Sequence, residues 1–63
     1  MNNTWYVCQY SSGELVAIDN NSGGYPYKAI NPGEVRYWND ESLAQKYADM
    51  FKFTVKKFIF EVE

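Results

Sequence analysis

The chain has no histidine and a single cysteine, Cys8. One cysteine cannot form an intrachain disulfide, and the common zinc and iron sites need cysteine or histidine ligands that are missing here. The most frequent general base in enzymes is absent as well. Asp40 and Glu41 are better explained as first-turn helix residues than as an acid–base pair. We therefore expect a protein that is not an enzyme and binds no metal or cofactor, with Cys8 buried in a strand.

Long apolar runs and an excess of one charge are also lacking. No stretch approaches the roughly 18 apolar residues of a membrane-spanning helix, and the start Met-Asn-Asn-Thr does not resemble a signal peptide. The 8 acidic and 6 basic residues give a net charge of −2 and are spread along the chain, whereas nucleic-acid binders usually carry a basic patch. We expect a cytoplasmic protein without membrane contact, and nucleic acid is disfavoured as a partner.

The chain is also short, because its 63 residues allow only one domain, 1–63. A chain of this length buries only about 60% of its unfolded surface. Aromatic residues make up 19% of it, and each buried ring removes about 150–250 Å² from water. We expect a core of few, large side chains, and a dimer or a partner would add stability.

Residues 39–52 have the pattern of an amphipathic helix. At 100° per residue, one arc collects the apolar side chains Leu43, Ala44, Tyr47, Ala48, Met50 and Phe51. Asn39 is placed to cap the first turn, and Lys52 would lie in the last turn, where the helix dipole favours a cation. Trp38 and Leu43 have the spacing of a hydrophobic staple.

Residues 53–63 are rich in β-branched and aromatic residues and predict a strand. Phe58 and Phe60 share one side, and we expect them to pack on the helix at Leu43, Tyr47 and Phe51. Ile59 would then point to the opposite side. Val55 has the parity of Ile59, which predicts either a bulge near positions 56 and 57 or a strand that begins after them.

Residues 5–10 and 15–18 predict a hairpin around a two-residue Ser12-Gly13 turn, with Tyr10 opposite Leu15 and residues 5–10 as a central strand. One face carries Trp5, Val7, Val16 and Ile18, and the other carries Tyr6, Tyr10 and Leu15. One helix covers only one face, so we expect a homodimer or another protein to cover the second face together with Ile59. The alternative is that residues 20–32 fold back over it.

The middle of the chain is punctuated by turn residues. Residues 19–24 predict a loop, and residues 25–30 an edge strand or an extended segment, because Pro26 cannot donate to a sheet. Residues 31–34 fit a type II turn, with glycine third, and residues 34–38 fit a short strand. The fold class is therefore α+β, an antiparallel sheet of four to five strands with one helix on one face, in the order β-β-(β)-β-α-β.

Aromatic residues gather near these turns. Tyr25 and Tyr27 follow two glycines, and Trp38 precedes the helix. Rigid aromatic anchors dominate many protein interfaces, so we expect these three rings to keep exposed surface in a partner-binding set with Lys28, Arg36 and Ile59. The structural alternative, that such rings close a small core, applies to about half of the aromatic residues beside these turns. Base stacking on single-stranded nucleic acid is a further alternative.

Three runs carry a resemblance in layout: Trp5-Tyr-Val, Ser22-Gly-Gly-Tyr-Pro-Tyr27, and Trp38-Asn-Asp-Glu-Ser-Leu-Ala-Gln-Lys-Tyr-Ala48. With these runs the chain resembles short uncharacterised accessory proteins of bacteriophages and prophages. The resemblance implies binding to a host or phage protein, including inhibition of it, and assigns no binding residues. A structural subunit of a phage particle is another function that it allows.

Overall fold

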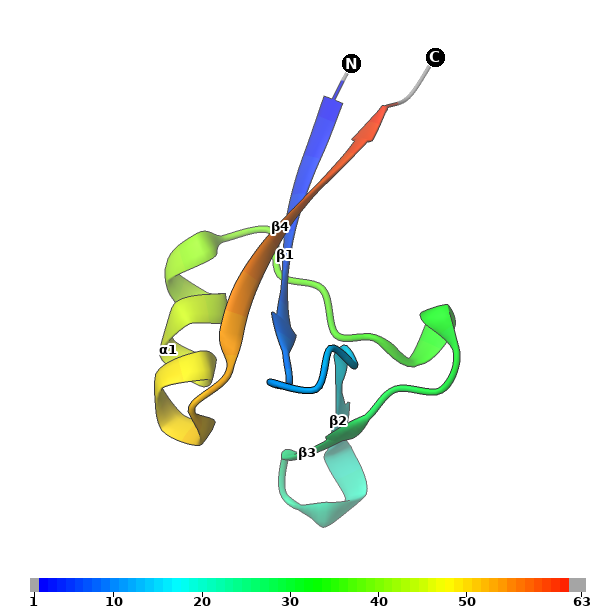
Figure 1. Ribbon diagram of the computed structural model, residues 1–63, viewed down its shortest axis with the longest axis vertical. Coiled ribbons are helices and arrows are strands. Elements are labelled where there is room, and N and C mark those ends of the chain that lie inside the picture. The colour runs from blue at the N-terminus through cyan, green and yellow to red at the C-terminus, as the bar shows by residue number, and fades with distance from the viewer. Residues whose placement is uncertain (1, 62–63) are drawn as a thin grey trace.

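Residues 2–61, the part of the chain that the computed structural model describes, form one α-helix, four β-strands and two 3₁₀ turns. The side chains of residues 2, 3, 22, 60 and 61 are not included in this description. The elements are β1 (Asn2–Gln9), β2 (Val16–Asp19), η1 (Asn20–Ser22), β3 (Tyr25–Lys28), η2 (Pro32–Glu34), α1 (Glu41–Phe51) and β4 (Thr54–Glu61). Figure 1 shows α1 alongside the lower part of the twisted β1–β4 ribbon, with β2 and β3 near the lower end. None of the helices in residues 2–61 has the length and apolarity needed to cross a membrane.

The α+β class is confirmed, but the single sheet of four to five strands is not. β1 pairs with β4, and β2 pairs with β3, in two separate antiparallel sheets. The predicted strand at 34–38 forms only isolated bridges, from Val35 to Ala17 of β2 and from Trp38 to Tyr6 of β1. Because this segment passes from one sheet to the other within a few residues, it does not form a ladder with either.

β1 pairs with β4 on one edge and forms only isolated bridges on the other, so it is not the central strand of a larger sheet that the sequence predicts. Tyr6 donates its N–H to the carbonyl of Trp38 (2.8 Å) and accepts from the N–H of Trp38 (2.9 Å). Further along the same edge, Gln9 bridges Leu15.

The turn after β1 is one residue longer than predicted. Gly13 donates its N–H to the carbonyl of Tyr10, and Tyr10 donates to the carbonyl of Glu14, both at 2.9 Å. Gly13 has a φ of +104°, as in hairpins that combine a turn with a bulged glycine. Leu15 therefore lies opposite Gln9, and the predicted pairing of Tyr10 with Leu15 is wrong.

The chain from Asn31 to Val35 forms a 3₁₀ turn in place of the predicted type II turn. Glu34 donates its N–H to the carbonyl of Asn31 at 3.0 Å, and Val35 donates to Pro32 at 3.3 Å. Gly33 does not have the positive φ that the third position of a type II turn requires. The predicted type II turn is wrong, and η2 takes its place.

Asp40, and not Asn39, caps α1. Its Oδ1 accepts hydrogen bonds from the backbone N–H of Ser42 (2.9 Å) and from the Ser42 hydroxyl (2.7 Å). At the other end, Lys52 has a left-handed φ of +62° and lies just after the helix, so its predicted place in the last turn is wrong. The carboxylate of Asp40 stabilises the exposed amides of the first turn.

The cap predicts an acid-sensitive contribution to stability. The hydrogen bonds from the Ser42 side chain and backbone lower the pKa of Asp40 below its ordinary 3.8. Because the folded-state pKa is the lower one, this stabilisation is present above the ordinary pKa and is lost as pH falls through the lowered pKa. We expect the melting temperature of Asp40→Asn to fall less steeply over that acid range, with stability near wild type at neutral pH. Equal acid slopes by circular dichroism would contradict this role.

β4 is continuous and uses the opposite side from the one predicted. It pairs with β1 through all eight of its residues, without a bulge. Cys8 lies opposite Val55, and the Cys8 thiol donates to the carbonyl of Ala44 in α1 at 3.4 Å, so the side that carries Val55 faces the helix. Phe58 lies on the other side and packs against Tyr37, with ring centroids 6.3 Å apart. The predicted contact of Phe58 with α1 is therefore wrong, and the side chain of residue 60 lies outside the described part.

Ile59 shares its side of β4 with Val55, so its predicted orientation away from the helix is wrong. It is nevertheless 57% exposed, because this end of β4 projects beyond α1 (Figure 1). The opposite face is not left open either. Val7 is fully buried there, and the ring of Tyr37 packs on Trp5 at 6.5 Å. An exposed second face is therefore no longer a reason to expect a dimer.

The core beneath α1 is built from small side chains and one large ring. Its buried members are Cys8, Val16, Trp38, Ala44 and Ala48. Partly buried side chains pack around them: Tyr6, Tyr10, Ile18, Tyr47, Phe53 and Val55. Leu43 and Met50, predicted as core, are 50% and 68% exposed, so the buried stripe of α1 is narrower than predicted. With Asp40 as the cap, Trp38 and Leu43 do not occupy the N′ and N4 positions of the predicted staple.

Candidate functional site

Exposed apolar side chains gather where β3 meets α1. A groove of about 480 Å³ separates these elements, and its lining is uncharged: Gly23, Gly24, Tyr25, Tyr47, Met50 and Phe51. Tyr25 is 65% exposed and Met50 is 68% exposed, whereas Tyr47 and Phe51 are partly buried. We call this hollow the β3–α1 groove, with Tyr25 and Met50 at its rim.

The backbone between β2 and β3 builds one wall of the groove. Asp19 caps η1 by accepting the N–H of Asn21 at 2.9 Å. Gly23 and Gly24 have φ values of +74° and +85°, and Gly24 donates its N–H back to the carbonyl of Asp19 at 3.0 Å. Only glycine adopts two such conformations in succession at low cost. The two glycines present a bare wall, since a Cβ added at either would meet nothing within 4 Å.

Tyr47 joins this wall to the helix. Its hydroxyl donates to the carbonyl of Gly24 at 2.9 Å. Its ring lies 5.5 Å from Trp38 and 4.9 Å from Phe51, measured between centroids. Burial raises the pKa of Tyr47 above its ordinary 10, so the hydroxyl stays protonated as a donor at neutral pH. These contacts hold the floor of the groove in place.

Tyr25 and Tyr27 keep the ring exposure that was predicted, at 65% and 41%. The edge of Tyr25 meets Phe51 at 6.4 Å. Burial and the nearby Glu34 carboxylate raise the pKa of Tyr27. Both tyrosines line a second hollow of about 430 Å³ with Asp19 and Pro26. Their role in binding stays a prediction.

Trp38 does not belong to this surface. It is only 8% exposed and packs in the core, so the predicted exposure of its ring is wrong. Arg36 lies over the Trp38 ring at 5.5 Å, which places its guanidinium on the buried tryptophan and away from Tyr25. The predicted set of Tyr25, Tyr27, Lys28, Arg36, Trp38 and Ile59 is thus not gathered at one place.

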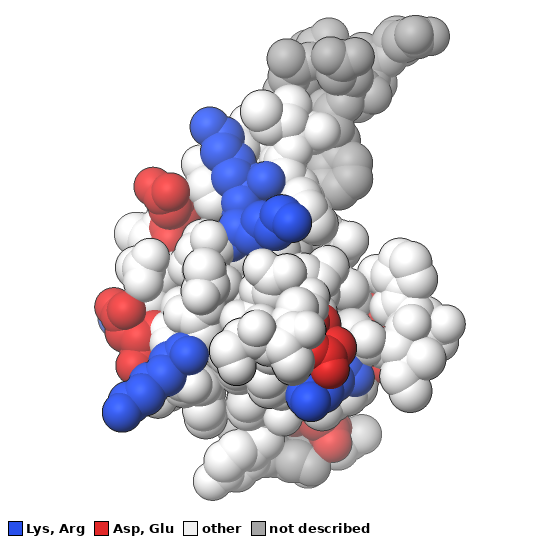
Figure 2. Space-filling model, viewed as in Figure 1, with Lys and Arg blue, Asp and Glu red and all other residues white. Residues whose placement is uncertain are grey.

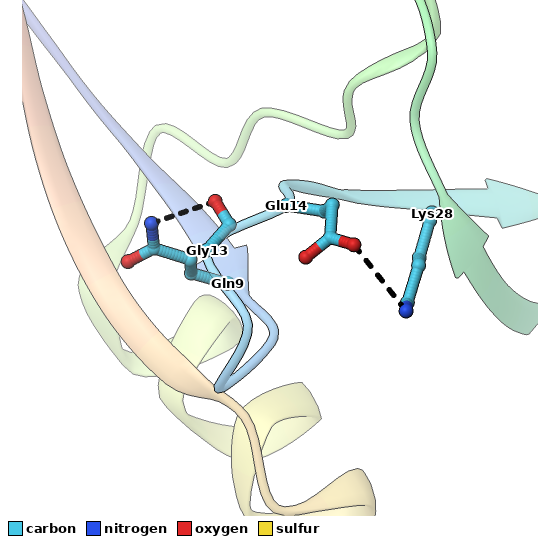
Figure 3. A network of polar contacts seen from close by, with 4 residues as sticks. All are labelled: Gln9, Gly13, Glu14 and Lys28. Carbon is cyan, nitrogen blue, oxygen red and sulfur yellow. Dashed lines mark hydrogen bonds and ion pairs between the residues drawn. The ribbon is translucent and has the colours of Figure 1, made fainter.

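Lys28 is already engaged by neighbours. Its Nζ lies 3.3 Å from Oε2 of Glu14, as Figure 3 shows, and 5.5 Å from the centroid of the Tyr10 ring. Hydrogen bonds from the Ser12 side chain and the backbone, then Lys28, lower the pKa of Glu14. The neighbouring bond from the Gln9 side chain to the Gly13 carbonyl fastens the same turn at 2.9 Å. Lys28 therefore serves the turn structure and is a weak candidate for phosphate binding.

The remaining chemistry of the described residues is sparse. Burial raises the pKa of the Cys8 thiol to about 11, which leaves it protonated and unreactive at neutral pH. Nowhere in residues 2–61 do three or more metal-ligating side chains come together. Basic and acidic side chains are interspersed on the face shown in Figure 2, without a large patch of either sign.

Sequence reasoning did not identify Met50, Tyr47 and Phe51 as surface-lining residues, because their helical spacing resembles a core stripe. The available signal was the pair Gly23-Gly24 before Tyr25, which predicted an ordered turn but not its contact with α1. No protein-family model, curated protein sequence or solved structure matches this chain. Its own surface is therefore the basis for assigning a function.

Proposed function

We propose that this chain is a non-enzymatic protein-binding module whose β3–α1 groove receives an apolar side chain of its partner. The observation that carries this proposal is the uncharged groove of about 480 Å³ with Tyr25 and Met50 exposed at its rim. Aromatic residues and methionine are enriched in protein interfaces. Contiguous exposed apolar surface on a small protein usually marks an interaction site.

The groove combines a fixed floor with an adaptable rim. The bond from Tyr47 to Gly24 and the packing of Tyr47 on Phe51 hold the floor before a partner arrives. A preformed site loses less conformational entropy on binding. Met50 has a flexible thioether side chain that adjusts to the shape of an inserted group. A partner segment that presents a bulky aliphatic or aromatic side chain fits this arrangement.

The resemblance to phage and prophage accessory proteins gives the class of partner. We expect a host or phage protein in the bacterial cytoplasm, with inhibition as the result where the bound segment is itself functional.

The proposal predicts a sharp difference between two similar truncations on α1. Met50 and Leu43 are both exposed apolar residues of the helix, but only Met50 lines the groove. Once affinity capture and mass spectrometry have identified a partner, we expect Tyr25→Ala and Met50→Ala to weaken binding about tenfold or more, as truncated anchors do. Leu43→Ala should remain within about twofold, because near-neutral positions surround such anchors. Titration calorimetry measures all four proteins, and thermal melting confirms that each is folded.

Two results would overturn the proposal. One is equal loss of binding for Met50→Ala and Leu43→Ala. The other is tight binding to a labelled single-stranded oligonucleotide that weakens steeply with salt, as counterion release requires. The buried Trp38 and the paired Lys28 argue against the second result.

A further inference from the structure

The outer edge of β4 carries backbone groups that point away from β1. Tyr6 directs both its N–H and its C=O to Trp38, away from β4. Tyr6 lies opposite Lys57, so these two residues form a non-hydrogen-bonded pair of the ladder. In antiparallel sheets such pairs alternate with hydrogen-bonded ones. The backbone groups of Lys57, and equally of Val55, Ile59 and Glu61, therefore point outward.

This edge is open at its far end. β4 is the last strand of its sheet, and among the described residues no backbone hydrogen bond reaches its outward groups. Figure 1 shows the ribbon of β4 continuing past the start of α1, and Ile59 in this stretch is 57% exposed. An exposed strand edge is a template for another strand.

The outer edge of β3 is a poorer template for strand pairing than that of β4, because it contains a proline. Val16 lies opposite Lys28 and gives its carbonyl to Arg36 on the far side. By the same alternation, the outward groups of β3 belong to Pro26 and Lys28. Pro26 has no N–H to donate, so this edge offers a single donor and is blunted as natural edge strands are. β4 has no proline and keeps a donor at every outward position.

We infer that two copies of this chain pair antiparallel through the outer edges of β4, with the two-fold axis at Ile59. In this register Ile59 lies opposite Ile59 of the second copy, and Lys57 lies opposite position 61, a glutamate, of the second copy. The outward groups at 57, 59 and 61 then all form hydrogen-bonded pairs. Unlike charges directly opposite each other stabilise an antiparallel pair.

The charges also disfavour the registers shifted toward the start of β4. Pairing centred on Lys57 places two lysines opposite each other, which destabilises the sheet. Pairing centred on Phe58 places Lys57 opposite Ile59 and forms no ion pair at position 57. A parallel, in-register arrangement brings Lys56 and Lys57 beside their own copies. Among the registers centred on residues 57 to 59, the Ile59-centred register is the one in which charge and hydrogen bonding agree.

Sedimentation over a range of protein concentrations tests the dimer through a charge exchange. We expect a weak monomer–dimer equilibrium, because the interface is small. Lys57→Glu and Glu61→Lys should each weaken it about tenfold or more, since attraction becomes repulsion at two symmetric places. The double variant should restore wild-type dimerisation, a result that a purely structural effect would not give.

A proline variant and amide exchange add readouts that do not depend on charge. Ile59→Pro removes an outward donor without removing a bond to β1, so it should be folded by circular dichroism and monomeric, whereas Ile59→Val should still dimerise. The amides of Lys57 and Ile59 should exchange quickly in dilute protein and slowly in concentrated protein. The Phe58 amide, directed to β1, should be slow in both.

A wild-type chain that stays monomeric at every concentration, or a folded double variant that stays dissociated, would overturn the inference. So would a dimer that is lost in Met50→Ala but retained in Ile59→Pro, because it would then form through the β3–α1 groove. The groove and the β4 edge are separate surfaces, so failure of this inference leaves the proposed function unaffected.

Discussion

The Trp38→Ala variant is expected to lose about 3–5 kcal/mol of unfolding free energy, the usual cost of truncating a large buried aromatic residue. Trp38 is 8% exposed and, among the described residues, is the only large ring of the buried core. Its removal also deprives Tyr47, 5.5 Å away, of one of its ring contacts. Natural domains have about 5–15 kcal/mol of stability, and a chain this small lies near the lower end. The variant should be largely unfolded at temperatures where the wild type is folded.

Urea denaturation measures this loss, with Trp5→Ala as the matched control. The chain has two tryptophans, so each variant keeps one as a fluorescent probe. Trp5 is half-buried and meets Tyr37 edge-on at 6.5 Å, so its truncation leaves a smaller cavity and should cost less. A Trp38→Ala protein with a wild-type midpoint would show that the ring lies outside the core.

The wrong prediction of an exposed Trp38 shows that local sequence patterns predict secondary-structure elements but not contacts between distant residues. Periodicity correctly predicted a helix after residue 39, a strand at the end of the chain, and a strand at β1. It did not predict the bridge between Tyr6 and Trp38, which directs the segment before α1 toward the core. That bridge joins residues distant in the chain, and no local spacing encodes it.

The sides of β4 were inverted for a related reason. The alternation of Phe58 and Phe60 identified an apolar side, but Val55 and Ile59 form another. The choice depends on Cys8, which lies opposite Val55 and bonds to Ala44. Small side chains on both elements let α1 approach closely, so a valine fits beneath it where a phenylalanine ring would not. The Phe58 ring then packs on the other side, with Tyr37.

The candidate site was predictable in part. The turn residues before Tyr25 indicated an exposed aromatic segment, and Tyr25 and Tyr27 are exposed. Met50 was missed because the apolar arc of α1 is wider than the stripe that a two-stranded ribbon can cover. Met50, one of the arc residues that the ribbon leaves uncovered, lies at the rim of the β3–α1 groove. Apolar residues at the margin of a helical stripe can therefore belong to a binding surface as well as to a core.

Substitutions on α1 should affect stability in the reverse of the order that its apolar arc predicts. Enlarging Ala44 or Ala48 should destabilise the protein more than truncating Leu43. Ala44 and Ala48 are fully buried, and the carbonyl of Ala44 lies 3.4 Å from the Cys8 sulfur. A leucine at either position must push α1 away from β1, and such overpacking typically costs about 1–3 kcal/mol. Leu43 is 50% exposed, so Leu43→Ala removes little buried surface and gains helix propensity, for a net change within about 0.5 kcal/mol.

Urea midpoints of Ala44→Leu, Ala48→Leu and Leu43→Ala test this order directly. A helix with Leu43 inward would lose about 2–5 kcal/mol in Leu43→Ala and would tolerate leucine at position 44. That outcome would place the buried stripe of α1 on its other margin and would remove Met50 from the rim of the groove. The observed bond from Cys8 to the Ala44 carbonyl requires the opposite, because it holds this turn of the helix against β1, where only a methyl group fits.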